Sequence, residues 1–324
     1  MRRREFIAVA AGVATLPFGA SAQQNIPVIG FLDLNPKNAD NILAEVRRGL
    51  AENGYVEGRD FQFDNRWSDY HSERLTANAV DLVQRGVAAI LMFKTQDVLV
   101  AKAATKSIPI VFWIGSDPVA TGIVGSLNRP GGNLTGCYNL NMALIGKRLE
   151  VLHELVPAVT SIAYFVNPRN EAYSAAETKE LQSAADALGV QLLIVNIATP
   201  NDIEAAFAKL LRERAGALFV GGDALFYSHR DRLAPLAAHH AIPAIFAARE
   251  YVTAGGLISF GTRYSDGYRL VGNYTAHILK GEKPSDLPVQ QITTSELVIN
   301  LEAAKSLGLT VPSTLLARAD EVIE

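Results

Sequence analysis

Polar side chains of the kinds that bind small charged molecules follow the ends of several predicted strands. In the first half of the chain these residues are Asp33, Asn35, Thr95, Gln96, Ser116 and Asp117. In the second half they are Asn167, Asp223, Phe226 and Glu250. Ligands of open parallel sheets bind beyond the carboxyl ends of the strands, where loops lead into helices. We therefore expect these residues to line one ligand-binding site.

The chemistry of these groups suits a molecule that carries both an acid and an amine. The hydroxyls of Thr95 and Ser116, together with free backbone N–H groups at helix N-termini, suit a carboxylate. Asp223 follows Gly221 and Gly222, which let the backbone come close to a ligand. Its carboxylate is suited to accept an ammonium group.

The same residues also have structural interpretations. Asp117 before Pro118 is typical of a helix N-cap, and capping alone would explain it. Asp223 could cap a turn in the same way, and Thr95 and Ser116 could be ordinary loop hydroxyls.

The remaining candidates near the predicted site have equally simple alternatives. Glu250 next to Arg249 could form a surface ion pair of little energetic value. Several aromatic side chains could either form a stacking wall for a ligand or belong to the core. These aromatic residues are Tyr138, Tyr173, Phe226 and Tyr227.

The sequence carries none of the compact motifs that organise catalysis or cofactor binding. A GxSxG elbow, a Walker phosphate loop, a GxGxxG dinucleotide loop and an HExxH zinc motif are all absent. His239 and His240 are adjacent in a predicted helix, so they point to different faces and do not suit a shared metal. The single cysteine, Cys137, allows no intramolecular disulfide and is expected to be buried. We expect no metal, no cofactor and no enzymatic activity.

The first 22 residues are typical of a cleaved export signal. Arginines at positions 2–4 precede an apolar run over residues 6–16 that is too short to span a bilayer. The small residues 20–22 predict cleavage before Gln23 and a periplasmic protein. Residues 3–7 match the twin-arginine form of such signals, with the general export route as the alternative. A buried N-terminal helix is the structural alternative.

The length and the net charge of the chain limit the classes of binding partner and the number of domains. The chain has 324 residues and a net charge of −3, which becomes about −5 when the signal is removed. A mildly acidic protein lacks the basic footprint that nucleic acids need, so we expect no nucleic-acid partner. The mature length fits two domains of ordinary size, and we expect a monomer.

Short apolar runs alternate with amphipathic helical stretches after the signal, which predicts parallel sheets built from βαβ units. The same pattern recurs about 134 residues later: residues 28–34 correspond to 162–168, and residues 108–112 correspond to 242–246. The predicted fold class is α/β, with two Rossmann-like lobes joined by a multi-strand hinge. The predicted division is 25–137 plus 255–284 for lobe 1 and 138–254 plus 285–324 for lobe 2.

Longer stretches of the sequence resemble a known family. They include residues 54–59 (GYVEGR), 108–112 (IPIVF), 117–119 (DPV), 129–136 (RPGGNLTG), 255–259 (GGLIS) and 296–301 (ELVINL). Along essentially the whole mature chain, the sequence resembles the exported substrate-binding proteins of ABC importers of the tryptophan/tyrosine type. The resemblance implies a type I periplasmic-binding-protein fold with three crossovers that closes on a small ligand.

The resemblance also implies a function. The chain would capture a small molecule, an amino acid or a related carboxylate, and deliver it to an ABC permease. Amino-acid binders of this fold use hydroxyls on first-lobe loops for the carboxylate, and Thr95 and Ser116 occupy such loops, while Asp223 suits the amine. The resemblance implies no metal or organic cofactor. The alternatives are a periplasmic sensor subunit acting on a membrane receptor and, less favoured, an enzyme on the same fold.

Overall fold

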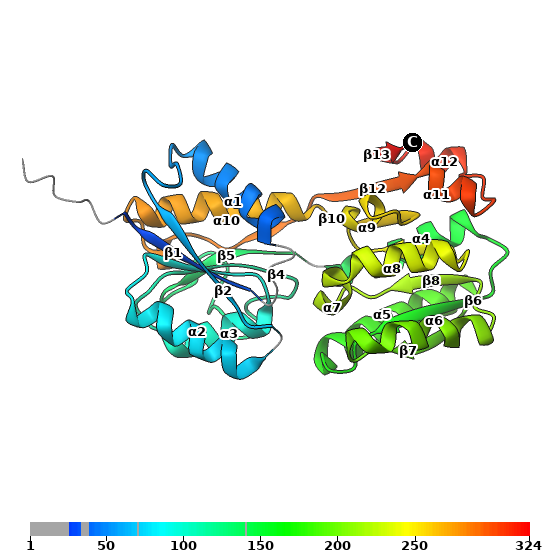
Figure 1. The fold of residues 1–324 in the computed structure, drawn as a ribbon, viewed down its shortest axis with the longest axis horizontal. Helices are drawn as coiled ribbons and strands as arrows, with labels where there is room; N and C mark the ends of the chain where they lie inside the picture. The colour runs from blue at the N-terminus through cyan, green and yellow to red at the C-terminus, as the bar shows by residue number, and fades with distance from the viewer. Residues whose placement is uncertain (1–25, 34–38, 70, 140) are drawn as a thin grey trace, which may run out of the picture.

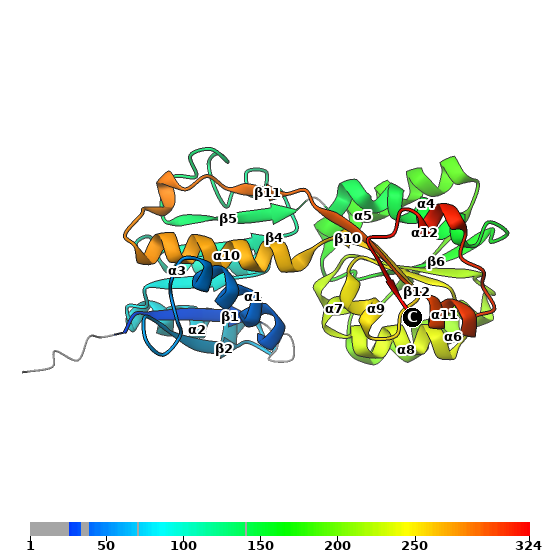
Figure 2. The same ribbon diagram turned by 90° about the horizontal axis from the view of Figure 1, so that it is seen from above.

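The computed structural model describes residues 26–33, 39–69, 71–139 and 141–324. The predicted export signal and Asn35 therefore lie outside the described residues. The chain forms two lobes, each built on one sheet (Figures 1 and 2). The predicted α/β class with two lobes is confirmed.

Lobe 1 is a six-stranded parallel sheet with the order β11-β5-β4-β3-β1-β2. Its strands are β1 (Val28–Asp33), β2 (Gln62–Trp67), β3 (Ala89–Met92), β4 (Ile110–Ile114), β5 (Leu134–Asn139) and β11 (Gln290–Ile292). Its helices are α1 (Ala39–Glu52), α2 (Ser72–Gln84), α3 (Thr95–Ala104), α10 (Tyr264–Leu279) and the 3₁₀ turn η4 (Pro284–Asp286). Helices α1 and α10 pack on one face of the sheet, and α2 and α3 pack on the other.

Strand β4 shows how the sequence produces this three-layered lobe. Val111 and Trp113 pack with the α1 and α10 side, whereas Ile110, Phe112 and Ile114 pack with the α2 and α3 side. Successive side chains of a strand point to opposite faces. A strand covered on both faces therefore needs a continuous apolar run, as parallel sheets usually show.

Lobe 2 is a seven-stranded sheet with the order β13-β12-β10-β9-β8-β6-β7. Its strands are β6 (Ser161–Val166), β7 (Gln191–Asn196), β8 (Ala217–Val220), β9 (Ala244–Phe246), β10 (Ile258–Thr262), β12 (Ser295–Asn300) and β13 (Glu321–Ile323). Its α-helices are α4 (Ile145–Leu155), α5 (Glu171–Leu188), α6 (Ile203–Arg212), α7 (Ala224–Ser228), α8 (Arg230–His239), α9 (Arg249–Thr253), α11 (Leu301–Ser306) and α12 (Ser313–Leu316). Its 3₁₀ turns are η2 (Asn141–Leu144) and η3 (Pro200–Asp202). Strand β12 runs antiparallel to β10, so this sheet is not purely parallel as predicted.

The lobes exchange segments differently from the predicted division. Strand β10, predicted in lobe 1, pairs with β9 and β12 in the sheet of lobe 2. Strand β11, predicted in lobe 2, pairs with β5 in the sheet of lobe 1. The chain therefore passes between the lobes after β5, after β10 and after β11 (Figure 2).

Hydrogen bonds of side chains and of the backbone link these three crossovers. Thr262 Oγ1 donates to Asn141 Oδ1 at 3.1 Å, and Asn141 Nδ2 donates to the Tyr264 hydroxyl at 3.3 Å. Arg263 donates through its backbone N–H to the Thr294 carbonyl at 3.2 Å. The three connections are therefore joined to one another by hydrogen bonds.

Glycines let α1 and α10 approach each other closely on the outer face of lobe 1. A Cβ added to Gly49 would lie 2.0 Å from the backbone carbonyl oxygen of Arg269, and one added to Gly272 would lie 2.2 Å from that of Val46. Asn53 Nδ2 donates to Asn273 Oδ1 at 2.9 Å at the same contact. The backbones of α1 and α10 therefore lie in close contact at these two glycines.

We expect Gly49→Ala to lower the free energy of unfolding by roughly 1–3 kcal/mol, because a methyl group against a backbone carbonyl must separate the helices. Urea denaturation of the two proteins measures this. Gly86→Ala is not a suitable control, because Gly86 has a positive φ of 64°. Gly146→Ala, whose Cβ would meet its nearest neighbour at 3.9 Å, is the matched control. An equal effect of both substitutions would contradict the packing argument.

Cys137 lies in β5 next to the first crossover. It is fully buried, and its thiol donates to the Gly267 carbonyl at 3.6 Å. Burial raises the pKa of this thiol well above its ordinary value. The prediction that Cys137 is buried is confirmed, and the raised pKa keeps the thiol protonated and unreactive.

Candidate functional site

The strand ends of lobe 1 carry a buried charged group. Strand β1 ends at Asp33, which is 5% exposed and accepts a hydrogen bond from Lys94 Nζ at 2.6 Å. Asp97, in the first turn of α3, is also buried. Burial raises the pKa of Asp97 to about 6, with Lys94 opposing the shift and Asp33 adding to it. Two carboxylates and one ammonium group thus occupy this end of the lobe.

The two predicted hydroxyls of lobe 1 are brought together. Thr95 Oγ1 and Ser116 Oγ lie 2.7 Å apart, and both side chains are half-buried. Gln96 is exposed. Asp117 is exposed, and its Oδ1 accepts from the backbone N–H groups of Val119 and Ala120. It therefore caps the segment as the structural alternative proposed, but residues 118–122 form turns and not the helix that the sequence predicts.

Asp223 occupies the matching position in lobe 2, directly after β8 and Gly221-Gly222. Its carboxylate caps α7 by accepting from Leu225 N at 2.8 Å. It also accepts from the side-chain amides of Asn167 and Asn170, each at 2.9 Å. All three donors are neutral, so in the described part of the chain no cationic side chain pairs with this carboxylate. Helix α7 lies at the end of lobe 2 nearest to lobe 1 (Figures 1 and 2).

Aromatic side chains form a continuous row across the two lobes, and we call this set the aromatic row. It consists of Trp113, Tyr264 and Tyr268 of lobe 1 and Tyr227 and Tyr251 of lobe 2. The ring centroids of Tyr227 and Tyr264, which belong to different lobes, are 5.3 Å apart. The row belongs to a hydrophobic cluster that contains residues of both lobes.

The hydroxyl of Tyr268 shows that this row lies between charged groups of both lobes. Its pKa is raised well above the ordinary value first by burial and then by Glu250 of lobe 2, with Tyr264 and Asp33 of lobe 1 adding to the shift. A hydrogen bond with Tyr227 opposes it. The row is therefore largely buried, and carboxylates of both lobes act electrostatically on it.

The four aromatic residues that the sequence offers as candidates for a stacking wall lie in different surroundings. Phe226 is completely buried in the hydrophobic core and does not belong to the aromatic row. The next residue, Tyr227, belongs to the aromatic row instead. Tyr138 packs in the core of lobe 1. Tyr173 is half-buried beside Gly222, where its hydroxyl would lie 2.5 Å from an added Cβ.

Glu250 is a half-buried carboxylate whose Oε2 atom is buried, and it is not paired with Arg249. Its Oε2 atom has no hydrogen-bond partner among the described residues, and burial raises the pKa of the group, with Arg230 opposing. Arg249 pairs instead with Glu321 at 2.8 Å. Arg230 stacks over the Tyr227 ring with its Cζ 4.9 Å from the centroid. Glu250 remains a predicted site residue.

Sequence reasoning left Trp113, Tyr251, Tyr264 and Tyr268 out of the candidate site. Tyr264 and Tyr268 are four residues apart at the start of α10, and this spacing puts both on one helix face. That spacing was the available signal. Trp113 lies in β4, whose residues are all buried. The sequence of such a strand is apolar throughout, so it does not show which side chain belongs to a ligand site and which to the core.

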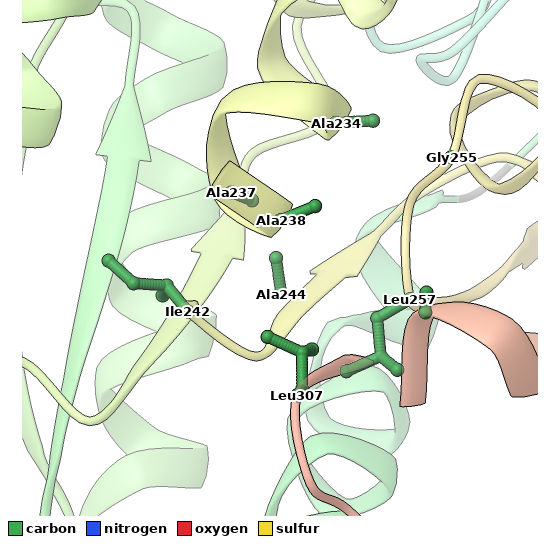
Figure 3. Close-up of a pocket in the computed structure, with 9 residues that line it drawn as sticks. Ala234, Ala237, Ala238, Ile242, Ala244, Gly255, Leu257 and Leu307 are labelled. Atoms are coloured by element: carbon green, nitrogen blue, oxygen red, sulfur yellow. The ribbon is translucent and has the colours of Figure 1, made fainter. Parts of the chain in front are cut away.

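A small cavity elsewhere in lobe 2 is not a ligand site. It has a volume of about 10 Å³ and is lined by residues of α8, β9 and α11 together with Ile242, Gly255, Leu257 and Leu307 (Figure 3). A single water needs about 10–15 Å³ and polar partners, and this lining is apolar. The cavity is a packing gap.

Two α/β lobes that present polar groups at their facing strand ends, joined by three crossovers, define a binding protein with the type I periplasmic-binding-protein fold. Residues 25–323 match the family described as ABC transporter substrate binding protein. The chain belongs to this family, which confirms the predicted resemblance. No helix in the described ranges is both long and apolar enough to span a membrane.

Related proteins share this architecture. The chain is 27% identical over 263 residues to a tyrosine-binding protein of Clostridioides difficile (strain R20291), covering 81% of this chain and 75% of that protein. It is similar to the solved ABC domain from Streptococcus pneumonia in complex with L-Trp, with 26% identity, a TM-score of 0.80, and coverage of 92% and 99% of the two chains. A ligand-free, open substrate-binding protein with adhesive properties from Clostridium difficile has the same identity and coverage with a TM-score of 0.66. These relatives are binding proteins, and this chain is likewise a binding protein and not an enzyme.

Proposed function

We propose that this protein captures an aromatic amino acid between its lobes and delivers it to an ABC permease. The aromatic row carries the proposal, because a ring seated against it would contact both lobes at once. Aromatic pairs contribute about 0.5–1.5 kcal/mol each beyond their buried area. The named relatives support the ligand class, since one is a tyrosine-binding protein and another holds L-Trp.

Charged groups beside the row would orient the ligand. The carboxylate of Asp223, which has only neutral donors, accepts the ammonium group of the amino acid. Thr95 and Ser116 present their hydroxyls from lobe 1. Because these groups belong to different lobes, the ligand stabilises the arrangement in which both reach it, and closure follows from this difference in affinity.

A thermal-shift screen of residues 23–324 tests this function. At one hundred times its dissociation constant, a ligand adds about 2.7 kcal/mol to the free energy of unfolding. We expect L-tryptophan or L-tyrosine to raise the melting temperature, and L-leucine, glucose and benzoate to leave it unchanged. A shift with glucose alone, or none with any aromatic amino acid, would contradict the proposal.

The protein works in the periplasm in this proposal, exported by the signal at residues 1–22. The pattern of residues 1–22 and the family support this, and a sensor subunit acting on a membrane receptor is the alternative partner arrangement. N-terminal sequencing of the protein from a periplasmic fraction is expected to begin at Gln23. A protein retained in the cytoplasm with its Met1 intact would contradict export.

A further inference from the structure

Arg148 is a buried cation that forms no ion pair within the part of the chain that the structure describes. It lies on α4 and has no exposed surface. Its Nε donates to the Phe260 carbonyl at 2.7 Å, and its Cζ lies 5.5 Å from the centroid of the Phe219 ring. Among the described residues, its Nη1 and Nη2 atoms have no hydrogen-bond partner. Burying a charge in this way is costly unless something pairs with it.

The charge of Arg148 acts on groups around the candidate site. Burial is the main cause that raises the pKa values of Tyr173, Glu177 and Tyr264, and Arg148 opposes the rise in each case. Tyr264 belongs to the aromatic row and is the first residue of α10, directly after the second crossover. Glu177 accepts from Gly222 N, the residue before Asp223, at 2.8 Å. The guanidinium thus lies within electrostatic reach of both the row and the ammonium subsite.

Glu177 does not neutralise Arg148 by direct pairing. Its carboxylate is already held by the Tyr164 hydroxyl and the Gly222 N–H, each at 2.8 Å. The guanidinium therefore retains a fork of donors whose geometry matches a carboxylate, because two parallel N–H groups can bind its two oxygens.

We propose that Arg148 binds the α-carboxylate of the ligand. This rests on the proposed function, in which the ligand is an amino acid. With Asp223 on the ammonium group, lobe 2 then holds both charged ends of the amino acid, and lobe 1 closes over it with Trp113 and Tyr268. The donors are covered in this structure, so this proposal requires the groups around Arg148 to move when the ligand enters. The alternative binding site for the carboxylate is formed by the hydroxyls of Thr95 and Ser116.

The test compares a ligand with its decarboxylated analogue. Isothermal titration calorimetry is carried out with L-tryptophan and tryptamine on the full mature protein, its Arg148→Met variant and a Thr95→Val/Ser116→Ala variant. We expect Arg148→Met to weaken L-tryptophan binding about 100-fold, as loss of one partner of a buried charge pair does. Tryptamine, which has no carboxylate, is expected to bind the variant and the wild type alike. The hydroxyl variant is expected to lose much less affinity for L-tryptophan than Arg148→Met does.

Other results would overturn the assignment. An equal loss of L-tryptophan and tryptamine would show that Arg148 only supports the fold. An unchanged affinity in Arg148→Met with a selective loss in the hydroxyl variant would place the carboxylate on lobe 1. If Arg148→Met does not fold, Arg148→Lys replaces it, and a selective loss for L-tryptophan is again expected. A wild type that binds neither L-tryptophan, L-tyrosine nor tryptamine would overturn the proposed function and this assignment together.

Discussion

Asp223→Asn lowers the affinity of the protein for an aromatic amino acid by about 2–5 kcal/mol, the usual loss when one partner of a buried, hydrogen-bonded charge pair is removed. The substitution takes away the negative charge that we assign to the ligand's ammonium group. It keeps an oxygen that can accept from Leu225 N, so α7 retains its cap. Calorimetric titration of L-tyrosine or L-tryptophan measures the effect.

Asp320→Asn is the matched control for this experiment. Asp320 also accepts a backbone hydrogen bond, from Leu297 N at 2.8 Å, but it lies between β12 and β13 at the C-terminal end of lobe 2. We expect its affinity for ligand to equal that of the wild type. If Asp223→Asn also bound ligand as tightly as the wild type, Asp223 would be only the cap of α7.

Asp97→Asn raises the free energy of unfolding at pH 7 by about 3 kcal/mol, because the side chain is 7% exposed and its pKa in the folded protein is about 6. In the unfolded chain an aspartate has a pKa of about 3.9. Between these two values the folded state binds more protons than the unfolded state. The wild type therefore loses stability as the pH rises from about 4 to about 6, by about 1.4 kcal/mol for each unit of pKa difference.

The Asp97→Asn variant lacks this loss, so the two proteins should have similar stabilities at pH 4 and diverge up to pH 6. Urea denaturation at pH 4, 5, 6 and 7 gives the four differences. Glu73→Gln, which changes an exposed carboxylate of α2, is the control and should show no such divergence. A difference between Asp97→Asn and wild type that is constant across the pH range would show that the effect is not one of titration.

Much of the fold could be predicted because it depends on local patterns. The apolar runs of β1 and β4 are continuous because both faces of a parallel sheet are buried. The second half of the chain repeats this pattern because it forms a second sheet. The exchange of β10 and β11 between the lobes could not be predicted in this way. Strand β11 has only three residues, and which sheet a short strand joins depends on contacts distant in sequence.

The candidate site shows the same division. Thr95, Ser116 and Asp223 could be named because the ends of parallel strands meet at one edge. Phe226 and Tyr227 are neighbours in a five-residue helix, and the orientation of so short a helix determines which ring enters the core. Arg148 lies among apolar residues of an amphipathic helix, where a charged side chain is normally expected in water. Its burial follows only from the packing of α4 against the sheet.

The three crossovers determine when each lobe can be completed during synthesis. Lobe 1 needs α10 and β11, and the Asn53–Asn273 contact that joins α1 to α10 spans 220 residues. Lobe 2 needs β12 and β13, which follow. Neither lobe is a continuous piece of chain, so a fragment that stops after β10 would lack part of each. Such long-range contacts favour slow folding, and the polypeptide reaches its final form only after almost all of it has been made.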